Sequence, residues 1–451
     1  MAARRRWPTV VAMDSAPTSV AALAAATPST RDRYVDFLRA FSIAVVVLGH
    51  WLMATVSWGP SGIRAGNALA AMPWLQPLTW VLQVMPVFFF VGGYAHHVGL
   101  AANRRRGGRY PDFVRGRIAR LLRPVAVLLA VWVPLTLLLD ASPLPSTVVR
   151  PVTKLVVQLL WFLGVYVLVV ALAPVFLSLH RLYGAAVPVA LAVAAAVLDV
   201  VSLGYGLRAV GFVNVLPVWL FAHQLGFFYA DGRLGRRAAF ALAAGGLAAL
   251  VALTAFGPYP TSMVGMPGDH VSNMSPPTLC IVALTCWLVG LVMLARPFVT
   301  RWLARPRVWT AVVALNGVVM TVFLWHLTAL LVAVLVLLPL GFPQPAVGTV
   351  AWWALRPVWF AILLALLGAL VAVFGRLERP RRTPVLTPSE RGTRRAVAGV
   401  VLVAFGILGL AVAGLSEPAT RSAVLLVVRV TPLTSLAYLG LGAVLLRSPA
   451  R

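Results

Sequence analysis

Long apolar runs constrain this chain more than any other feature of its sequence. A helix that crosses a bilayer needs about 20 predominantly apolar residues, and only 11% of these 451 residues are charged. A typical soluble domain is about 25% charged. The sequence therefore predicts an all-α, polytopic transmembrane helical bundle of about ten core spans plus a two-span C-terminal annex. The expected spans lie at about 36–57, 76–100, 122–140, 154–177, 185–204, 209–229, 237–256, 277–295, 309–338, 352–375, 396–415 and 422–446.

The net charge of +27 comes from arginines that gather in alternate connections between the spans. This is the positive-inside pattern, and it predicts that both termini are cytoplasmic. A protein that binds nucleic acid would instead gather its basic residues on one soluble face, so no nucleic-acid partner is expected. We predict a multi-pass protein of a bacterial plasma (inner) membrane, surrounded by membrane lipid. The opposite side of the membrane keeps Arg64, Arg150, Lys154, Arg208, Arg356 and Arg421.

Composition divides the chain into five parts. Residues 1–34 are rich in Ala, Pro, Ser and Thr and are expected to form a disordered cytoplasmic tail. A ten-span core is expected over 35–376, and a cytoplasmic linker rich in Pro, Thr and charge over 377–395. Two additional transmembrane helices are expected over 396–446, followed by a cytoplasmic C-terminus over 447–451.

The first expected span carries ionisable residues, which are costly within a bilayer and therefore mark candidate functional sites. Arg39 and His50 are eleven residues apart, or about three helical turns, so they share one stripe of the helix. Asp36 lies nearly one turn before Arg39 on almost the same face. This arrangement suits chemistry or proton handling within the membrane.

Other polar residues fall in or beside later spans. His223 and His326 lie in apolar segments, and His326 follows Trp325. The neighbouring His96 and His97 are interpreted as interfacial polar residues. The sequence has no glutamate within a predicted span, so a carboxylate mechanism in the bilayer lacks a glutamate candidate.

Arg117 and Arg120 lie three residues apart in the segment FVRGRIARLLRP. At this spacing they share a helix face and are suited to grip phosphates. Arg115 and Arg123 are alternatives in the same cluster. Cys280 and Cys286, six residues apart on a helix, face different directions, so neither a disulfide nor a metal site is expected.

Seven segments together resemble the acyltransferase-3 family of integral membrane acyltransferases, in order, over about residues 31–376. The first is the Arg-x10-His element of Arg39 and His50 with its preceding Arg33 and Asp36, in which Ala40 replaces a frequent glycine. The second is the Arg-x-x-Arg pair before Pro124. The other five are MPVFFFVGGYAHH (85–97), WFLGVYVL (161–168), LPVWLFAHQLGFFYADGRL (216–234), MVGMPGDHVSNMSPPTL (263–279) and NGVVMTVFLWHLTALLV (316–332).

The resemblance implies an enzyme that transfers an acyl group, with acetyl as the expected group, from acyl-CoA to a hydroxyl of a carbohydrate, a glycolipid or a secondary metabolite. Arg117 and Arg120 are expected to hold the phosphates of the donor at the cytoplasmic side. His50 is expected to act as general base or as transient acyl carrier, with Arg39 and Asp36 beside it. His223, His326 and Trp325 are accessory candidates. No permanently bound cofactor is expected, and acyl-CoA is the donor substrate.

Two alternatives stay open at this point. Twelve spans with both termini inside also suit a secondary transporter or exporter, although no internal repeat is evident. A non-enzymatic membrane subunit is the second alternative, but it leaves His50 and Arg39 without a role.

Overall fold

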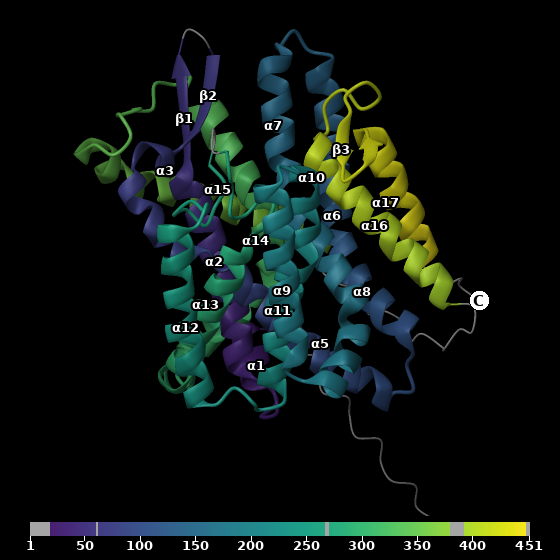
Figure 1. Cartoon of the computed structure of the whole chain (residues 1–451). Coiled ribbons are helices and arrows are strands. Elements are labelled where there is room, and N and C mark those ends of the chain that lie inside the picture. Colours follow the sequence, from purple (N-terminus) through teal and green to yellow (C-terminus); the bar gives the residue numbers. More distant parts are fainter. Residues whose placement is uncertain (1–18, 60–61, 267–269, 379–391, 448–451) are drawn as a thin grey trace, which may run out of the picture.

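The computed structural model describes residues 19–59, 62–266, 270–378 and 392–447 (Figure 1). Among them, 11 helices are long and apolar enough to cross a membrane, which confirms the predicted helical bundle. The long helices are α2 (Arg33–Met53), α5 (Met85–Arg105), α6 (Tyr110–Asp140), α8 (Leu160–Tyr183), α9 (Ala186–Asp199), α11 (Val215–Ala230), α12 (Arg236–Phe256), α13 (Leu279–Leu303), α14 (Pro306–Leu337), α15 (Val350–Glu378), α16 (Thr393–Ala413) and α17 (Pro432–Leu446).

Short elements connect these helices. They are α1 (Val20–Ala25), α3 (Ala68–Ala71), η1 (Pro73–Leu78), α4 (Thr79–Leu82), α7 (Ser146–Gln158), η2 (Val200–Gly204), α10 (Arg208–Gly211) and η3 (Phe212–Asn214). Within the described ranges, four strands form two antiparallel hairpins, β1 (Ala54–Gly59) with β2 (Gly62–Asn67) and β3 (Ala423–Leu425) with β4 (Val428–Val430).

The two ends of the bundle differ in charge and in structure. Both hairpins and α7 lie at one end, which we call the hairpin end (Figure 1). α1, the end of α5 and the start of α6 lie at the opposite end, which we call the basic end because Arg104, Arg105, Arg106 and Arg109 are there. Arg150 of α7 lies at the hairpin end, opposite these four arginines.

Close helix packing in the core depends on glycine. Gly93 of α5 and Gly226 of α11 face each other, and a Cβ atom on Gly93 would lie 2.0 Å from the backbone oxygen of His223. A Cβ atom on Gly226 would lie 2.1 Å from the backbone oxygen of Phe90. Small residues let helices in membranes approach this closely, and here they bring the buried side chains of α5 and α11 together.

We expect Gly93→Ala to destabilise the protein by about 1–3 kcal/mol, because two helix backbones must separate to admit the methyl group. The measurement is the thermal unfolding midpoint of the purified protein in detergent. Gly245→Ala in α12 is the matched control, since its Cβ would meet no atom within 4 Å. Equal midpoints for the two variants would contradict the close approach of α5 and α11.

The C-terminal annex differs from its prediction in one respect. The twelfth span expected over 422–446 is instead the β3–β4 hairpin followed by α17, an apolar helix of 15 residues. Arg429 therefore lies in an exposed strand and not within a span. The linker predicted over 377–395 lies largely outside the described residues.

The annex packs directly on the core. Gly164 of α8 lies against Leu408 and Ile407 of α16. At the hairpin end, Asp140 accepts hydrogen bonds from the Ser416 hydroxyl at 2.6 Å and the Glu417 backbone N–H at 2.8 Å. Arg150 pairs with Glu417 at 2.6 Å, so the turn that follows α16 is fixed to α6 and α7.

The N-terminal segment expected to be a disordered tail contains α1 in its described part. Trp309 of α14 donates from its indole nitrogen to the backbone oxygen of Ala24 at 3.2 Å. Asp32 then caps α2 by accepting from the backbone N–H groups of Tyr34 and Val35, as N-cap carboxylates do. The prediction for residues 1–18 lies outside the described residues.

Candidate active site

The structure brings together two histidines that are 276 residues apart in sequence. His50, in the last turn of α2, places its Nδ1 atom 2.9 Å from Nε2 of His326 in α14. The ring planes are nearly parallel, at 3°. Both residues are candidates from their sequence positions, but only the parallel packing of α2 and α14 makes them a pair.

The hydrogen bonds of this pair determine where the protons of two neutral imidazoles lie. Nδ1 of His326 lies 2.7 Å from the backbone oxygen of Phe323, which can only accept, so Nδ1 carries the proton. Nε2 of His326 must then accept, and Nδ1 of His50 donates to it. Nε2 of His50 is left with a free lone pair, which is the form that a general base requires.

Burial separates the roles of the two rings. His326 is fully buried at 0% exposure, whereas His50 is partly exposed. The indole nitrogen of Trp51 donates to the backbone oxygen of His326 at 3.0 Å and so fixes the two helices next to the pair. His326 is therefore enclosed by the core, while His50 keeps part of its ring accessible.

Asp36 lies at the other end of α2, near the basic end, and does not contact His50. Its buried carboxylate accepts from Nε of Arg31 at 2.5 Å and lies 3.5 Å from Nη1 of Arg39. This carboxylate raises the pKa of the Arg31 guanidinium above its ordinary value, mainly through the hydrogen bond. Asn316 of α14 donates to the Asp36 backbone oxygen at 2.9 Å. Asp36 and Arg39 thus anchor α2 about 16–21 Å below the histidine pair, counted at 1.5 Å per residue.

Arg117 and Arg120 lie at the basic end, and their side chains take different directions. Arg117 donates from Nη2 to the backbone oxygen of Ala95 at 2.7 Å and lies over the ring of Phe113. Arg120 is exposed and donates to Gly116 on its own helix. Arg120 and Arg39 are near enough for their charges to act on Arg117.

The alternative arginines of this cluster are engaged differently. Arg115 is buried at 5% exposure, and its Nε has no hydrogen-bond partner among the described residues. Arg123 donates to the backbone oxygen of Leu377 at 2.9 Å and so connects α6 to α15.

A second buried histidine pair lies between α5 and α11. Nδ1 of His96 is 2.9 Å from Nε2 of His223, and the Tyr166 hydroxyl is 3.2 Å from Nε2 of His96. Both rings are completely buried. His223 is thus a member of a polar cluster in the core, separate from the His50–His326 pair, and His96 is a core residue and not the interfacial residue that its sequence position suggested.

Trp325 points away from His326, toward α15. Its indole nitrogen donates to the Glu378 carboxylate at 2.9 Å, and its ring stacks on Phe374. The Thr321 hydroxyl donates to the same carboxylate at 2.5 Å. The expectation that no glutamate lies within a span is therefore wrong, because α15 extends to Glu378 and buries its carboxylate against α14.

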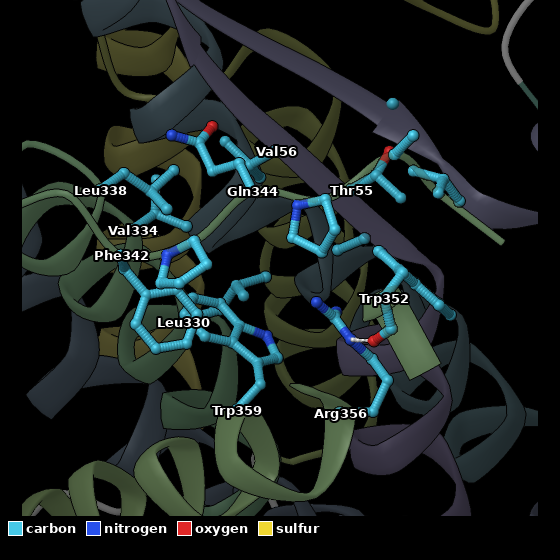
Figure 2. A pocket seen from close by; sticks show the side chains of 16 residues that line it. Thr55, Val56, Leu330, Val334, Leu338, Phe342, Gln344, Trp352, Arg356 and Trp359 are labelled. Carbon is cyan, nitrogen blue, oxygen red and sulfur yellow. Dashed lines mark hydrogen bonds between the residues drawn. The ribbon is translucent and has the colours of Figure 1, made fainter. Parts of the chain in front are cut away.

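A pocket of about 310 Å³ opens one helical turn beyond the histidine pair, toward the hairpin end. Figure 2 shows the side chains that line it. Ala54 and Leu330 line it, and each follows one of the two histidines by four residues. Its other walls come from β1, from the connection between α14 and α15, and from the first turns of α15. Within it lies Arg356, whose Nε donates to the backbone oxygen of Trp352 at 3.3 Å.

Arg356 was not predicted to be a functional residue. One signal in the sequence could have indicated it. Arg356 is one of the few basic residues expected on the non-cytoplasmic side of the membrane, where the positive-inside pattern places little arginine. Its spacing of four residues from Trp352 and three from Trp359 predicts stacking on a helix, and the guanidinium lies 4.3 Å from the Trp352 ring centroid.

Among the described residues, no group of three or more His, Cys, Asp and Glu side chains is arranged to hold a metal ion. The described residues place a histidine pair one helical turn from a pocket toward one end of the bundle and several arginines toward the other.

One of three comparisons with known proteins shows the family of this chain. No curated protein and no solved structure matches it. The model of the acyltransferase-3 family, described as an acyltransferase domain, matches residues 32–376, which is well over half of the chain. With its helices of membrane-spanning length, the protein belongs to the acyltransferase-3 family of membrane acyltransferases.

Proposed function

We propose that this protein is an O-acyltransferase that moves an acyl group, acetyl in the simplest case, from acyl-CoA to a hydroxyl of a carbohydrate, a glycolipid or a secondary metabolite. The observation that carries the proposal is the contact of 2.9 Å between Nδ1 of His50 and Nε2 of His326, which, with the contact of His326 to Phe323, leaves Nε2 of His50 with a free lone pair. The family assignment supplies acyl transfer as the reaction class. A secondary transporter is not favoured by that assignment.

The reaction requires one proton transfer and one exchange of bonds. Nε2 of His50 takes the proton of the acceptor hydroxyl as its oxygen attacks the thioester carbonyl carbon. The carbon–oxygen bond forms, the carbon–sulfur bond breaks, and the thiolate leaves with the proton that His50 releases. The imidazolium that forms on His50 still donates from Nδ1 to His326, so the hydrogen bond strengthens as charge develops. If His50 carries the acyl group instead, the same Nε2 atom is the nucleophile.

The basic end is the proposed binding site for the donor phosphates. Arg117, Arg120 and Arg39 place like charges near one another, and in the described structure only Arg39 pairs with a carboxylate. A polyphosphate donor relieves that repulsion and accepts bidentate hydrogen bonds. Its acyl arm then runs along α2 toward His50.

The test is turnover of radiolabelled acetyl-CoA by the purified wild-type protein in detergent, with a mixture of glycan and glycolipid acceptors. We expect label to move to an acceptor hydroxyl at a rate that depends on His50. If the protein neither consumes nor binds acetyl-CoA, the donor assignment is wrong and the transporter alternative must be considered again.

Replacing both Arg117 and Arg120 by Gln is expected to raise the KM for acetyl-CoA at least about 10-fold, because each lost charge-assisted hydrogen bond costs about 1.5–3 kcal/mol. The KM for the acceptor should stay unchanged. The control is a double Gln variant of Arg104 and Arg105, two exposed arginines at the same end. A similar rise in both double variants would assign the effect to general surface charge and contradict a specific phosphate site.

A further inference from the structure

The pocket at the hairpin end contains a cation without a carboxylate partner. No acidic side chain lines it, and no ion pair involves Arg356 in the part of the chain that the structure describes. By contrast, Arg150 at the same end is paired with Glu417 at 2.6 Å. A half-buried, unpaired guanidinium is costly in surroundings of low polarity, so its retention in this pocket needs a reason.

The neighbours of Arg356 hold its guanidinium in place and leave its outer nitrogens available. The group stacks on Trp352 at 4.3 Å and lies 6.0 Å from the Trp359 centroid. Only Nε has a hydrogen-bond acceptor among the described residues. The two Nη atoms therefore present a preorganised fork, the geometry that binds a carboxylate or a phosphate bidentately.

The other walls of the pocket suit a ring-shaped molecule. Figure 2 shows Trp359 beside Arg356, with Phe342 and Leu330 next to Trp359 and with Thr55 and Val56 across from them. The Phe342 and Trp359 rings lie 5.5 Å apart and form an aromatic wall. Gln344 and Thr55 add polar groups to this lining.

The pocket also lies at a suitable distance from the histidine pair. Trp51, next to His50, contacts Phe360 at 6.5 Å between ring centroids. Arg356 precedes Phe360 by four residues, so it lies about 6 Å further toward the hairpin end. Ala54 and Leu330, which line the pocket, follow His50 and His326 by one helical turn, so an acceptor held in the pocket lies about one turn from the pair.

We infer that this pocket is the acceptor subsite and that it selects a sugar ring carrying an anionic group, either a carboxylate or a phosphate, which Arg356 binds. This inference rests on the proposed function, because it names the acceptor class for the same reaction. Arg356 is a specificity residue that contacts the acceptor, and it takes no part in proton transfer.

The experiment uses matched acceptors with the full-length protein in detergent. The first pair is 4-nitrophenyl β-glucuronide and 4-nitrophenyl β-glucoside, which differ in one carboxylate. The second pair is glucose 6-phosphate and glucose, which tests phosphate as the anion. Equilibrium dialysis measures binding of each compound, and transfer from labelled acetyl-CoA is measured in parallel.

We expect the wild type to bind one charged compound about 10- to 100-fold more tightly than its neutral partner, as a charge-assisted contact provides. Arg356→Gln should remove that preference and leave the KM for acetyl-CoA unchanged. Arg208→Gln, which removes an exposed charge at the same end, should keep the preference. Arg356→Lys, which keeps the charge without the fork, should retain only part of it.

The outcomes separate the two proposals. Equal binding of charged and neutral partners by the wild type overturns the pocket assignment, even where acetyl transfer occurs. A preference that persists in Arg356→Gln also overturns it. Binding that depends on Arg356 without any turnover of acetyl-CoA supports the anion pocket and contradicts the proposed function.

Discussion

Replacing His50 by alanine is expected to lower the rate of acyl transfer by about 10²–10⁴-fold, the usual contribution of a positioned general base. The variant removes the one ring whose Nε2 lone pair is left free by the hydrogen bonds of the pair. The effect should appear in kcat, because the interaction of Nε2 with the hydroxyl proton strengthens in the transition state and contributes little to binding of the substrate in its ground state. If His50 acts as an acyl carrier instead, its replacement by alanine is also expected to lower the rate of acyl transfer.

The measurement is transfer of labelled acetyl to an acceptor, together with the amount and the size-exclusion profile of the purified variant. His270→Ala is the matched control, because His270 is an exposed histidine in a connection outside the long helices. Acetyl transfer at the wild-type rate by correctly folded His50→Ala would exclude His50 from the chemistry. A fall in His270→Ala as well would indicate a general effect of losing a histidine.

The sequence predicts much of this molecule because its strongest signals are local. Apolar runs, the arginine distribution and the eleven-residue spacing of Arg39 and His50 are all visible without tertiary structure, and the helices confirm the first of these. The hairpin at 423–430 was not predicted, because Val and Leu favour strands and apolar helices alike in a short run. Positive φ at Leu426 marks the turn that makes the difference.

Local sequence patterns do not show which distant residue each polar side chain contacts. His326 was one of several histidines in apolar sequence, and nothing within α14 indicates that it meets His50 and not His223. Arg31, and not only Arg39, pairs with Asp36, because the turn before α2 folds its side chain back onto the helix. Arg356 was visible in the sequence only as a charge on the side of the membrane expected to carry few arginines. Its pocket forms from β1, α14 and α15 together.

The His50–His326 pair itself supplies the second large effect. His326→Leu is expected to reduce kcat by about 10²–10³-fold, because Nδ1–H of His50 loses its acceptor and the ring loses its fixed tautomer and orientation. His326→Gln should retain a larger share of activity, since an amide oxygen can take the place of Nε2 as acceptor. Rescue by the variant that can accept a hydrogen bond distinguishes a positioning role from simple core packing, which a leucine fills at least as well.

Steady-state kinetics distinguish a positioning role of His326 from simple core packing. A positioning residue predicts a lower kcat with little change in the KM for either substrate, because His326 is fully buried and is placed behind His50. Each variant changes a side chain in the core, so its unfolding temperature is measured and activities are compared at matched stability. If the Leu and Gln variants are equally impaired at equal stability, the hydrogen bond to His50 is not what His326 contributes, and the free lone pair on Nε2 would need another cause.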